Sequence, residues 1–311
     1  MNKPILILLS SFILWNGCII YDEREEEIEE TNKSTAFILC EGNFGNSNAA
    51  LWSFSPEDST RKTLILGGTS LGDVAQSLSA DDNKLYVVVN NSHKIEVLSV
   101  GEEISHEGTI TFNNASPRYL VTNGTTGYVS CWNLNAILVL DLTNQAVVDT
   151  ISIPGMPEKM ILNGTSLYVS IPSHSDWSSA NLVLEISTIT KTIDQTFEVI
   201  SGPNDMELIG NHLFVASTYY GANWTTFTGI SKINLSTGTI TSNSDGSNSV
   251  IKGDLVKVGE TLYRTTSTGL ASVNVDLSLD LDTILGGQTN VYSASADDNY
   301  IYFGTTDWTA P

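Results

Sequence analysis

One short sequence motif recurs in this chain of 311 residues, as Leu167-Tyr168-Val169-Ser170, Leu213-Phe214-Val215-Ala216 and Leu85-Tyr86-Val87. An aromatic residue beside apolar and β-branched neighbours favours a β-strand. Comparable aromatic residues, called anchors below, recur along the whole chain with gaps of 39 to 49 residues. They are Phe37, Tyr86, Tyr128, Tyr168, Phe214, Tyr263 and Tyr302. This period predicts a repeat architecture of seven units.

Each anchor after the first is preceded by a short turn, and most of these turns hold residues that tolerate positive φ, as hairpins need. The turns are Asp82-Asn83, Asn123-Gly124, Asn163-Gly164, Gly210-Asn211, Gly259-Glu260 and Asp298-Asn299. Each of the first six anchors is followed by an apolar strand, in the ranges 51–54, 95–98, 137–142, 182–186, 230–235 and 270–275. Four short antiparallel strands in every 40 to 50 residues are typical of a propeller blade.

The expected fold is therefore all-β, a seven-bladed β-propeller that occupies residues 35–311 as one domain. A β-sandwich or a solenoid could also be built from short strands, but equal units with turns at a fixed phase favour radial closure. Blade one lacks room for an innermost strand, and the chain ends just after the second strand of blade seven. We expect either imperfect closure or, preferably, a missing segment of roughly 30 residues, judged from the repeat length.

The N-terminus has the pattern of a lipoprotein signal peptide over residues 1–17. Lys3 precedes the apolar run 5–14, which is about half the roughly 20 residues that a bilayer crossing requires. Gly17-Cys18 stands where a lipoprotein signal peptidase would cut, so Cys18 is the expected site of lipidation. Ordinary secretion with an unmodified Cys18 is the alternative.

An acidic run follows, so residues 18–34 are expected to be a disordered tether behind the lipidated cysteine. It contains Asp22, Glu23, Glu25, Glu26, Glu27, Glu29 and Glu30, with Arg24 as the only opposing charge. A second interpretation is an address for display on the cell surface. The formal net charge of the whole chain is −21, which makes nucleic acid a poor partner. Cys40 and Cys131 occupy equivalent positions in blades one and three, too far apart to form a disulfide, and are expected to be small buried residues.

Ligand contacts are expected on one end of the ring, where the loop after each second strand meets the segment that leads into an innermost strand. Trp132, Trp177, Trp224 and Trp308 lie in such loops. The segments leading inward include Ser116-Pro117-Arg118-Tyr119, Met156-Pro157-Glu158-Lys159, Gly202-Pro203-Asn204-Asp205 and Lys252-Gly253-Asp254. The candidate ligand-binding residues are Phe44, Asp73, His93, Arg118, Trp132, Glu158, Trp177, Asn204, Tyr220, Trp224 and Trp308. Aromatic residues around convergent polar groups are typical of a binding site, although such residues can also serve only to shape turns and shield blade edges.

No catalytic or metal-binding constellation is apparent in the sequence. The four His residues are scattered, and Asp276, Asp280 and Asp282 lack the Gly and terminal Glu of a calcium loop. There is no phosphate-binding Gly loop or nucleophile elbow. We therefore expect no cofactor, no metal and no self-contained enzyme.

Four segments together give the chain a recognisable resemblance: Glu41-Gly42-Asn43-Phe44-Gly45, Leu71-Gly72-Asp73-Val74-Ala75-Gln76-Ser77, Asn90-Asn91-Ser92-His93-Lys94-Ile95-Glu96-Val97 and Ser116-Pro117-Arg118-Tyr119. They resemble the YncE-like, surface-layer-type propeller lipoproteins, whose fold is of the quinoprotein-dehydrogenase-like (YVTN) kind. One branch of similar proteins captures cobalamin at the cell surface and passes it to an outer-membrane transporter. The resemblance thus implies an outer-membrane lipoprotein, exposed at the cell surface, that binds a small ligand such as a corrinoid.

Two other functions remain open at this stage. The chain could be a protein or glycan interaction module of an envelope complex, without a small ligand. It could also be a subunit of a quinoprotein-dehydrogenase-type enzyme, which would need a partner that carries the cofactor.

Overall fold

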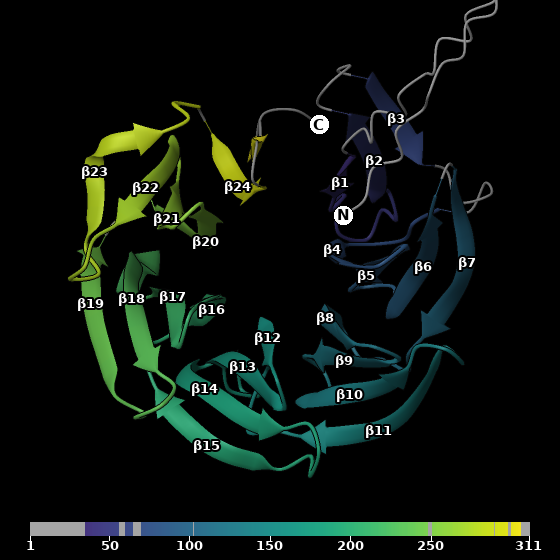
Figure 1. Ribbon diagram of the computed structural model, residues 1–311, viewed down its shortest axis with the longest axis horizontal. Helices are drawn as coiled ribbons and strands as arrows, with labels where there is room; N and C mark the ends of the chain where they lie inside the picture. Colours follow the sequence, from purple (N-terminus) through teal and green to yellow (C-terminus); the bar gives the residue numbers. More distant parts are fainter. Residues whose placement is uncertain are drawn as a thin grey trace, which may run out of the picture.

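The computed structural model describes residues 35–55, 60–64, 70–101, 103–247, 251–288, 290–297 and 300–305. These residues form seven antiparallel sheets, which stand around a common centre (Figure 1). The fold is therefore the β-propeller that the repeat predicts, and the sheets are numbered below as blades one to seven in chain order. The segments predicted to be a signal peptide and an acidic tether, together with Cys18 and Trp308, lie outside the described residues.

The strands of the first four blades follow one another along the chain. Blade one comprises β1 (Ala36–Cys40), β2 (Ala50–Ser55) and β3 (Thr60–Leu64). Blade two comprises β4 (Ala75–Asp81), β5 (Lys84–Val89), β6 (Lys94–Val100) and β7 (Ile104–Thr111). Blade three comprises β8 (Pro117–Asn123), β9 (Thr126–Cys131), β10 (Ala136–Asp141) and β11 (Ala146–Ser152). Blade four comprises β12 (Met160–Asn163), β13 (Ser166–Ser173), β14 (Ser179–Ser187) and β15 (Ile193–Glu198).

The last three blades continue the same order. Blade five comprises β16 (Pro203–Ile209), β17 (His212–Tyr220), β18 (Thr226–Asn234) and β19 (Ile240–Ser247), with the 3₁₀ turn η1 (Ala222–Trp224) between β17 and β18. Blade six comprises β20 (Ile251–Val258), β21 (Thr261–Thr266), β22 (Gly269–Val273) and β23 (Leu279–Leu285). Blade seven comprises β24 (Val291–Ala296) and β25 (Ile301–Thr305). In each four-stranded blade the first strand lies nearest the centre of the ring (Figure 1).

The anchor aromatics all lie on the strand that the sequence assigns to them. Phe37 is on β1 and Tyr302 is on β25, while the other five lie on β5, β9, β13, β17 and β21. In blade one the anchor strand is the inner edge of the described sheet, because its order is β1-β2-β3. The prediction that blade one lacks an innermost strand is confirmed for the described residues.

The turns before the anchors adopt the left-handed backbone that their composition predicts. Asp82 has a φ of 48°, and Gly124, Gly164, Gly210 and Gly259 have φ values between 57° and 61°. No atom lies within 4 Å of a Cβ built on any of these four glycines, so the positive φ, and not close packing, favours glycine there. The turn at residues 298–299 lies outside the described residues.

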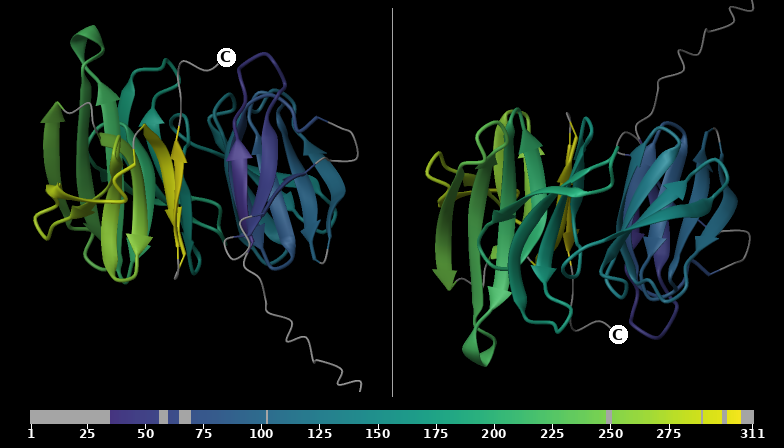
Figure 2. Two further views of the ribbon diagram at one scale, coloured as in Figure 1. Left: turned by 90° about the horizontal axis from the view of Figure 1, so that it is seen from above. Right: turned by 90° about the horizontal axis from the view of Figure 1, so that it is seen from below.

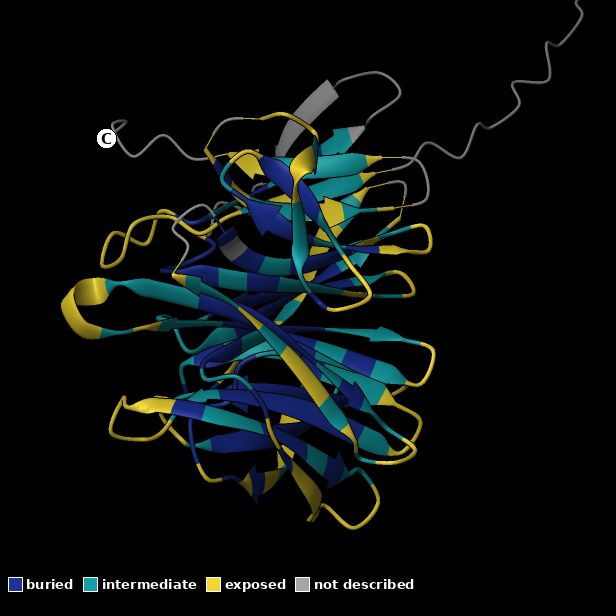
Figure 3. Cartoon of the chain, turned by 90° about the vertical axis from the view of Figure 1, so that its left-hand side faces the viewer, coloured by how far each residue is buried: buried dark blue, intermediate teal, exposed yellow. Residues whose placement is uncertain are grey.

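Each anchor and the residue after it face the two neighbouring blades. Tyr168 packs in a cluster with Leu213 of blade five, whereas Val169 packs in a cluster with Ile137 of blade three. The same alternation holds for Tyr128 and Val129, which belong to the clusters shared with blades four and two. Successive side chains of a strand point to opposite sides of a sheet, so in blades two to five one aromatic-Val pair contacts the blades on both sides. Figure 3 shows the buried residues concentrated in these layers between sheets.

The two cysteines of the described residues differ in burial. Cys131 is buried in the cluster between blades two and three, where burial raises the pKa of its thiol to about 12. Cys40 is exposed, so the prediction that it is a buried small residue is wrong. The physical reason is its strand: β1 is the inner edge of its sheet, and no described strand covers it.

A charged side chain joins blades five and six. Arg264 on β21 has a relative exposure of 0% and donates hydrogen bonds to the main-chain carbonyls of Ser217 (2.7 Å) and Gly229 (2.8 Å). Its nearest carboxylate is that of Asp245, at 3.5 Å. Burial lowers the pKa of the guanidinium to about 10, which leaves it charged at neutral pH.

Candidate ligand-binding site at the channel mouth

One end of the ring gathers the loops after the second strands and the segments that lead into the innermost strands; we call this surface the mouth face. Main-chain hydrogen bonds join the two kinds of segment, for example from Trp132 N–H to Ser116 C=O (3.1 Å) and from Thr218 N–H to Gly202 C=O (2.9 Å). Figure 2 shows the β1–β2 loop and the β17–β18 hairpin projecting from this same face. The predicted convergence of these segments is therefore present.

One polar and aromatic cluster of the mouth face is built around Arg118, from blades two, three and four. Its Nε and Nη2 donate hydrogen bonds to the Glu158 carboxylate at 2.9 and 2.7 Å, and Nη1 donates to Gln76 Oε1. The guanidinium carbon lies 3.9 Å from the centroid of the Trp132 ring. The side chains of Arg118 and Glu158 are 15% and 8% exposed. A bidentate ion pair stacked on an indole gives the guanidinium a fixed position and orientation.

Trp177 extends this cluster into solvent. Its ring meets that of Trp132 edge to face, with the centroids 5.6 Å apart, and the residue is 65% exposed. Its φ is 67°, and Trp224 has a φ of 60°, a region that bulky residues seldom adopt. Backbone strain of this kind tends to occur where a side chain is held in place for recognition or catalysis. The two tryptophans are thus presented outward at a conformational cost.

The β17–β18 hairpin carries a second aromatic group. Tyr219 and Phe227 stack at 5.2 Å along the hairpin, while Tyr220 and Trp224 meet at 6.2 Å at its tip. Tyr220 is 60% exposed and Trp224 is 84% exposed. The hairpin projects beyond the neighbouring loops (Figures 2 and 3). Its tip therefore presents aromatic surface outward from the mouth face.

The other predicted site residues have different surroundings. Phe44 is 78% exposed in the β1–β2 loop. The buried Asp73 carboxylate accepts hydrogen bonds from Gly45 N–H and from the side-chain amide of Asn91, so it connects two loops. His93 accepts a hydrogen bond from the main-chain N–H of Ser116 (3.1 Å) and likewise supports the loops. These contacts show how Asp73 and His93 hold the mouth face in shape.

Asn204 lies at the start of β16, the innermost strand of blade five. Its Oδ1 is buried and has no hydrogen-bond partner among the described residues. Its side-chain amide nitrogen would lie 2.9 Å from a Cβ at Gly253, which has a φ of 140°, so glycine there leaves room for the amide. The predicted Trp308 is outside the described residues.

Next to the Arg118 cluster, a second charged group lines the channel. Lys159, which follows Glu158 directly, places its ammonium 3.0 Å from Asp205 Oδ1 and 5.3 Å from the centroid of the Tyr119 ring. Asp205 Oδ2 accepts a hydrogen bond from Leu255 N–H at 2.7 Å. The charge of Asp205 raises the pKa of Lys159, although burial opposes the shift. Sequence reasoning named the segments that contain Lys159 and Asp205 but did not single out these two residues. The available signal was a charged residue directly after each predicted one, because Lys159 follows Glu158 and Asp205 follows Asn204.

Two absences apply to the part of the chain that the structure describes. Within it, no group of three or more His, Cys, Asp or Glu residues is arranged to hold a metal ion. None of its helices has the length and apolar character needed to cross a membrane.

Comparisons with known proteins add information about the fold. No protein-family model matches the chain, and no curated protein matches it by sequence. Among solved structures, virginiamycin B lyase from Staphylococcus aureus is similar with a TM-score of 0.60 and 14% identity, over 87% of this chain and 96% of that one. A protein from Lactobacillus plantarum has a TM-score of 0.64 and 12% identity, over 89% of this chain and 90% of that one.

A putative 6-phosphogluconolactonase from Bacteroides uniformis gives a TM-score of 0.59 at 14% identity, over 79% of this chain and 80% of that one. Two of these three neighbours are named as enzymes, but identities this low carry information about the fold alone. The chain is a β-propeller similar in overall structure to these proteins.

Proposed function

We propose that this protein captures a small ligand on the mouth face and delivers it without chemical change. The observation that carries the proposal is the cluster of Arg118, Glu158, Trp132 and Trp177, in which a fixed ion pair stands beside an outward-facing indole. Such a combination offers stacking surface together with hydrogen-bonding groups of both polarities. It has the composition of a recognition site.

The resemblance to YncE-like, surface-layer-type propeller lipoproteins supports a more specific form of the proposal. In that form the protein is anchored through Cys18 on the outer membrane, faces the exterior, and passes its ligand to an outer-membrane transporter. A corrinoid is the sharpest candidate, because a large ring and its amide side chains could use both the indoles and the polar groups of the mouth face. A Cys18→Ala variant tests the anchor: release of the protein from the membrane fraction is expected.

The ligand experiment is equilibrium binding of the purified protein to cyanocobalamin, a corrinoid precursor and a set of neutral oligosaccharides. Truncation of a central aromatic at a recognition site typically costs about 2 kcal/mol, so Trp177→Ala should weaken binding by roughly thirtyfold. Ile189→Ala is the matched control, because Ile189 is 74% exposed but lies in the β14–β15 turn on the opposite face. Unchanged affinity in both Trp177→Ala and Trp224→Ala would refute binding at the mouth face.

A protein or glycan interaction module remains the second candidate, favoured by the exposed Tyr220–Trp224 tip. An exposed aromatic pair on a projecting hairpin resembles the anchors that dominate many interfaces. In the same binding experiment, oligosaccharide binding that depends on Trp224 and no corrinoid binding would favour this function.

A further inference from the structure

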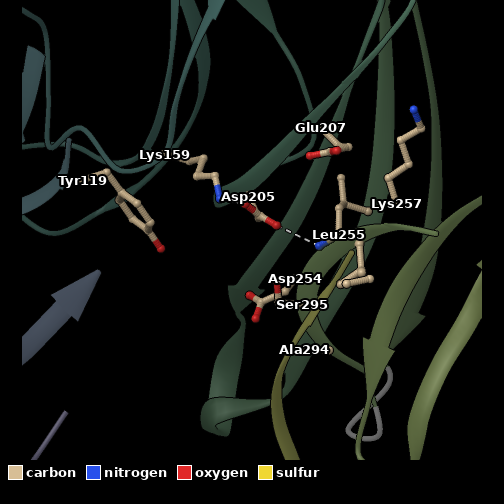
Figure 4. A pocket seen from close by; sticks show the side chains of 11 residues that line it. Tyr119, Lys159, Asp205, Glu207, Asp254, Leu255, Lys257, Ala294 and Ser295 are labelled. Atoms are coloured by element: carbon tan, nitrogen blue, oxygen red, sulfur yellow. Dashed lines mark hydrogen bonds and ion pairs between the residues drawn. The ribbon is translucent and has the colours of Figure 1, made fainter. Parts of the chain in front are cut away.

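A cavity of about 300 Å³ lies in the central channel, between the innermost strands of blades three to seven. Its wall includes Tyr119 on β8, Lys159 before β12, Asp205 and Glu207 on β16, and Asp254 on β20. Figure 4 shows Lys159 beside Asp205, while Asp254 lies across from the Tyr119 hydroxyl. The lining on the blade-seven side is small, from Ala294 to Ala296. We call this space the channel cavity; its size suits a small metabolite and not a corrinoid.

The positive charge of Lys159 in this cavity is already compensated. Its ammonium pairs with Asp205, whose other carboxylate oxygen accepts the main-chain N–H of Leu255. Asp205 is therefore committed to two donors supplied by the protein. The pair is part of the wall and offers no free carboxylate to a ligand.

Asp254 is in the opposite situation. Its main-chain N–H donates to Thr265 Oγ1, but its carboxylate has no hydrogen bond or ion pair within the described part of the chain. Glu207 also has no ion pair there. Two other charged groups near the cavity are Lys257, which is exposed, and the buried Arg264, which is held by main-chain carbonyls of blade five. Among the described residues, neither a hydrogen-bond donor nor a positively charged group is therefore paired with the Asp254 carboxylate.

The protonation of Asp254 reflects this missing partner. Burial and, to a lesser extent, the nearby charge of Asp205 together raise the pKa of its carboxyl to about 7, against the opposing charges of Lys159 and Arg264. Burial likewise raises the pKa of Glu207. Asp254 is half-buried, and a carboxylate held there without a donor costs free energy that a ligand supplying the donor recovers.

We propose that the channel cavity binds a small ligand that carries a protonated aliphatic amine, with the ammonium against the Asp254 carboxylate. An ammonium supplies three hydrogen-bond donors and a compact positive charge, which this carboxylate lacks. The Tyr119 hydroxyl lies on the far side of the same space. This inference does not depend on ligand binding at the mouth face.

The test is calorimetric titration of the purified protein with four probes of one chain length. They are 1,4-diaminobutane, 4-aminobutanoate, butanoate and 1-butanol. The two amines are expected to bind at least about tenfold more tightly than the other two, the strength of roughly one charge-assisted hydrogen bond. Binding of butanoate or butanol as tightly as the amines, or no amine binding at all, would overturn the proposal, as would Ca²⁺ binding that excludes the amines.

Two variants and a change of pH make the test specific. Asp254→Asn should weaken amine binding at least about tenfold. Glu260→Gln, in an exposed turn at the opposite end of the ring, should leave it unchanged. Between about pH 8 and about pH 5 the wild type should lose more than about tenfold in affinity, because Asp254 gains a proton while an alkylamine stays charged. The Asp254→Asn protein should not show this loss, and amine affinity that is the same in both proteins at every pH would contradict the proposal.

A third variant separates this site from the mouth face. Trp177→Ala should retain amine binding even where it removes binding of a mouth-face ligand. Equal loss of amine binding in Trp177→Ala and Asp254→Asn would place the amine at the mouth face and overturn the assignment to the channel cavity.

Discussion

Arg118 and Arg264 show how two regions of one propeller use the same side chain differently. Arg118 is 15% exposed at the mouth face and pairs with a carboxylate and an indole. Arg264 is fully buried between blades five and six and bonds mainly to main-chain carbonyls. The first arrangement leaves its aromatic surroundings open to a ligand, whereas the second satisfies the backbone of a neighbouring blade. Position in the ring, and not residue type, thus separates an arginine in a solvent-accessible cluster from an arginine that packs two blades together.

The largest expected effect comes from breaking the buried arrangement. Arg264→Met leaves the carbonyls of Ser217 and Gly229 without their donor and Asp245 without its nearest cation, which should lower the free energy of unfolding by about 3 kcal/mol or more. Arg118→Met should cost about half as much, because water at the mouth can hydrate Glu158. Urea unfolding of both variants measures the difference. A larger loss for Arg118→Met would reverse the comparison.

Tyr168 on β13 and Trp177 in the loop after this strand provide a second contrast. Tyr168 is 4% exposed between blades four and five, so Tyr168→Ala should create a cavity and cost about 3 kcal/mol. Trp177 is 65% exposed, and Trp177→Ala should change stability by less than about 1 kcal/mol. Thermal unfolding of the two variants side by side decides the matter. Similar destabilisation by both would mean that Trp177 belongs to the core.

A smaller effect, with a defined pH dependence, is expected at Asp254. Its folded-state pKa of about 7 exceeds the unfolded value of about 4, so the folded chain keeps the proton to a higher pH. Stability should therefore fall as pH rises from about 4 to about 7. Asp254→Asn should be more stable than the wild type by roughly 2 kcal/mol at about pH 8, after allowance for solvent screening, and equal to it near pH 4. Urea unfolding at several pH values tests this, and an advantage that grows as pH falls would contradict the assignment.

The smallest effect concerns the reactivity of the two cysteines. Cys40 is exposed, while Cys131 is buried with a raised thiol pKa. Because the thiolate is the reactive form, iodoacetamide should modify Cys40 in the folded protein and leave Cys131 intact. Peptide mass spectrometry after brief labelling gives the ratio. Equal labelling in the folded state would show that β1 and β9 do not differ in burial as described.

The sequence by itself determined the number of blades and the phase of their strands. Anchors such as Tyr168 and turns such as Asn163-Gly164 act locally: the anchor specifies an alternating strand, and the glycine permits the positive φ that closes the hairpin. It also indicated the face on which the loops gather, because strand direction alternates within each blade. The exposure of Cys40 escaped it, because burial at that position depends on a strand inside β1.

Only the tertiary structure decided which side chains of that face act together. Arg118 and Glu158 are 40 residues apart, and Lys159 and Asp205 come from different blades, yet each pair is in direct contact. Asp73 and His93 resemble site residues in sequence but are used to join loops. In the sequence Asp254 is one residue of a segment that leads inward, and only the folded channel shows that its carboxylate has no partner among the described residues. The anchors and turns within each repeat specify the strands of one blade. The charge pairs join different blades, so they depend on how neighbouring blades are placed around the central axis, which no single repeat specifies.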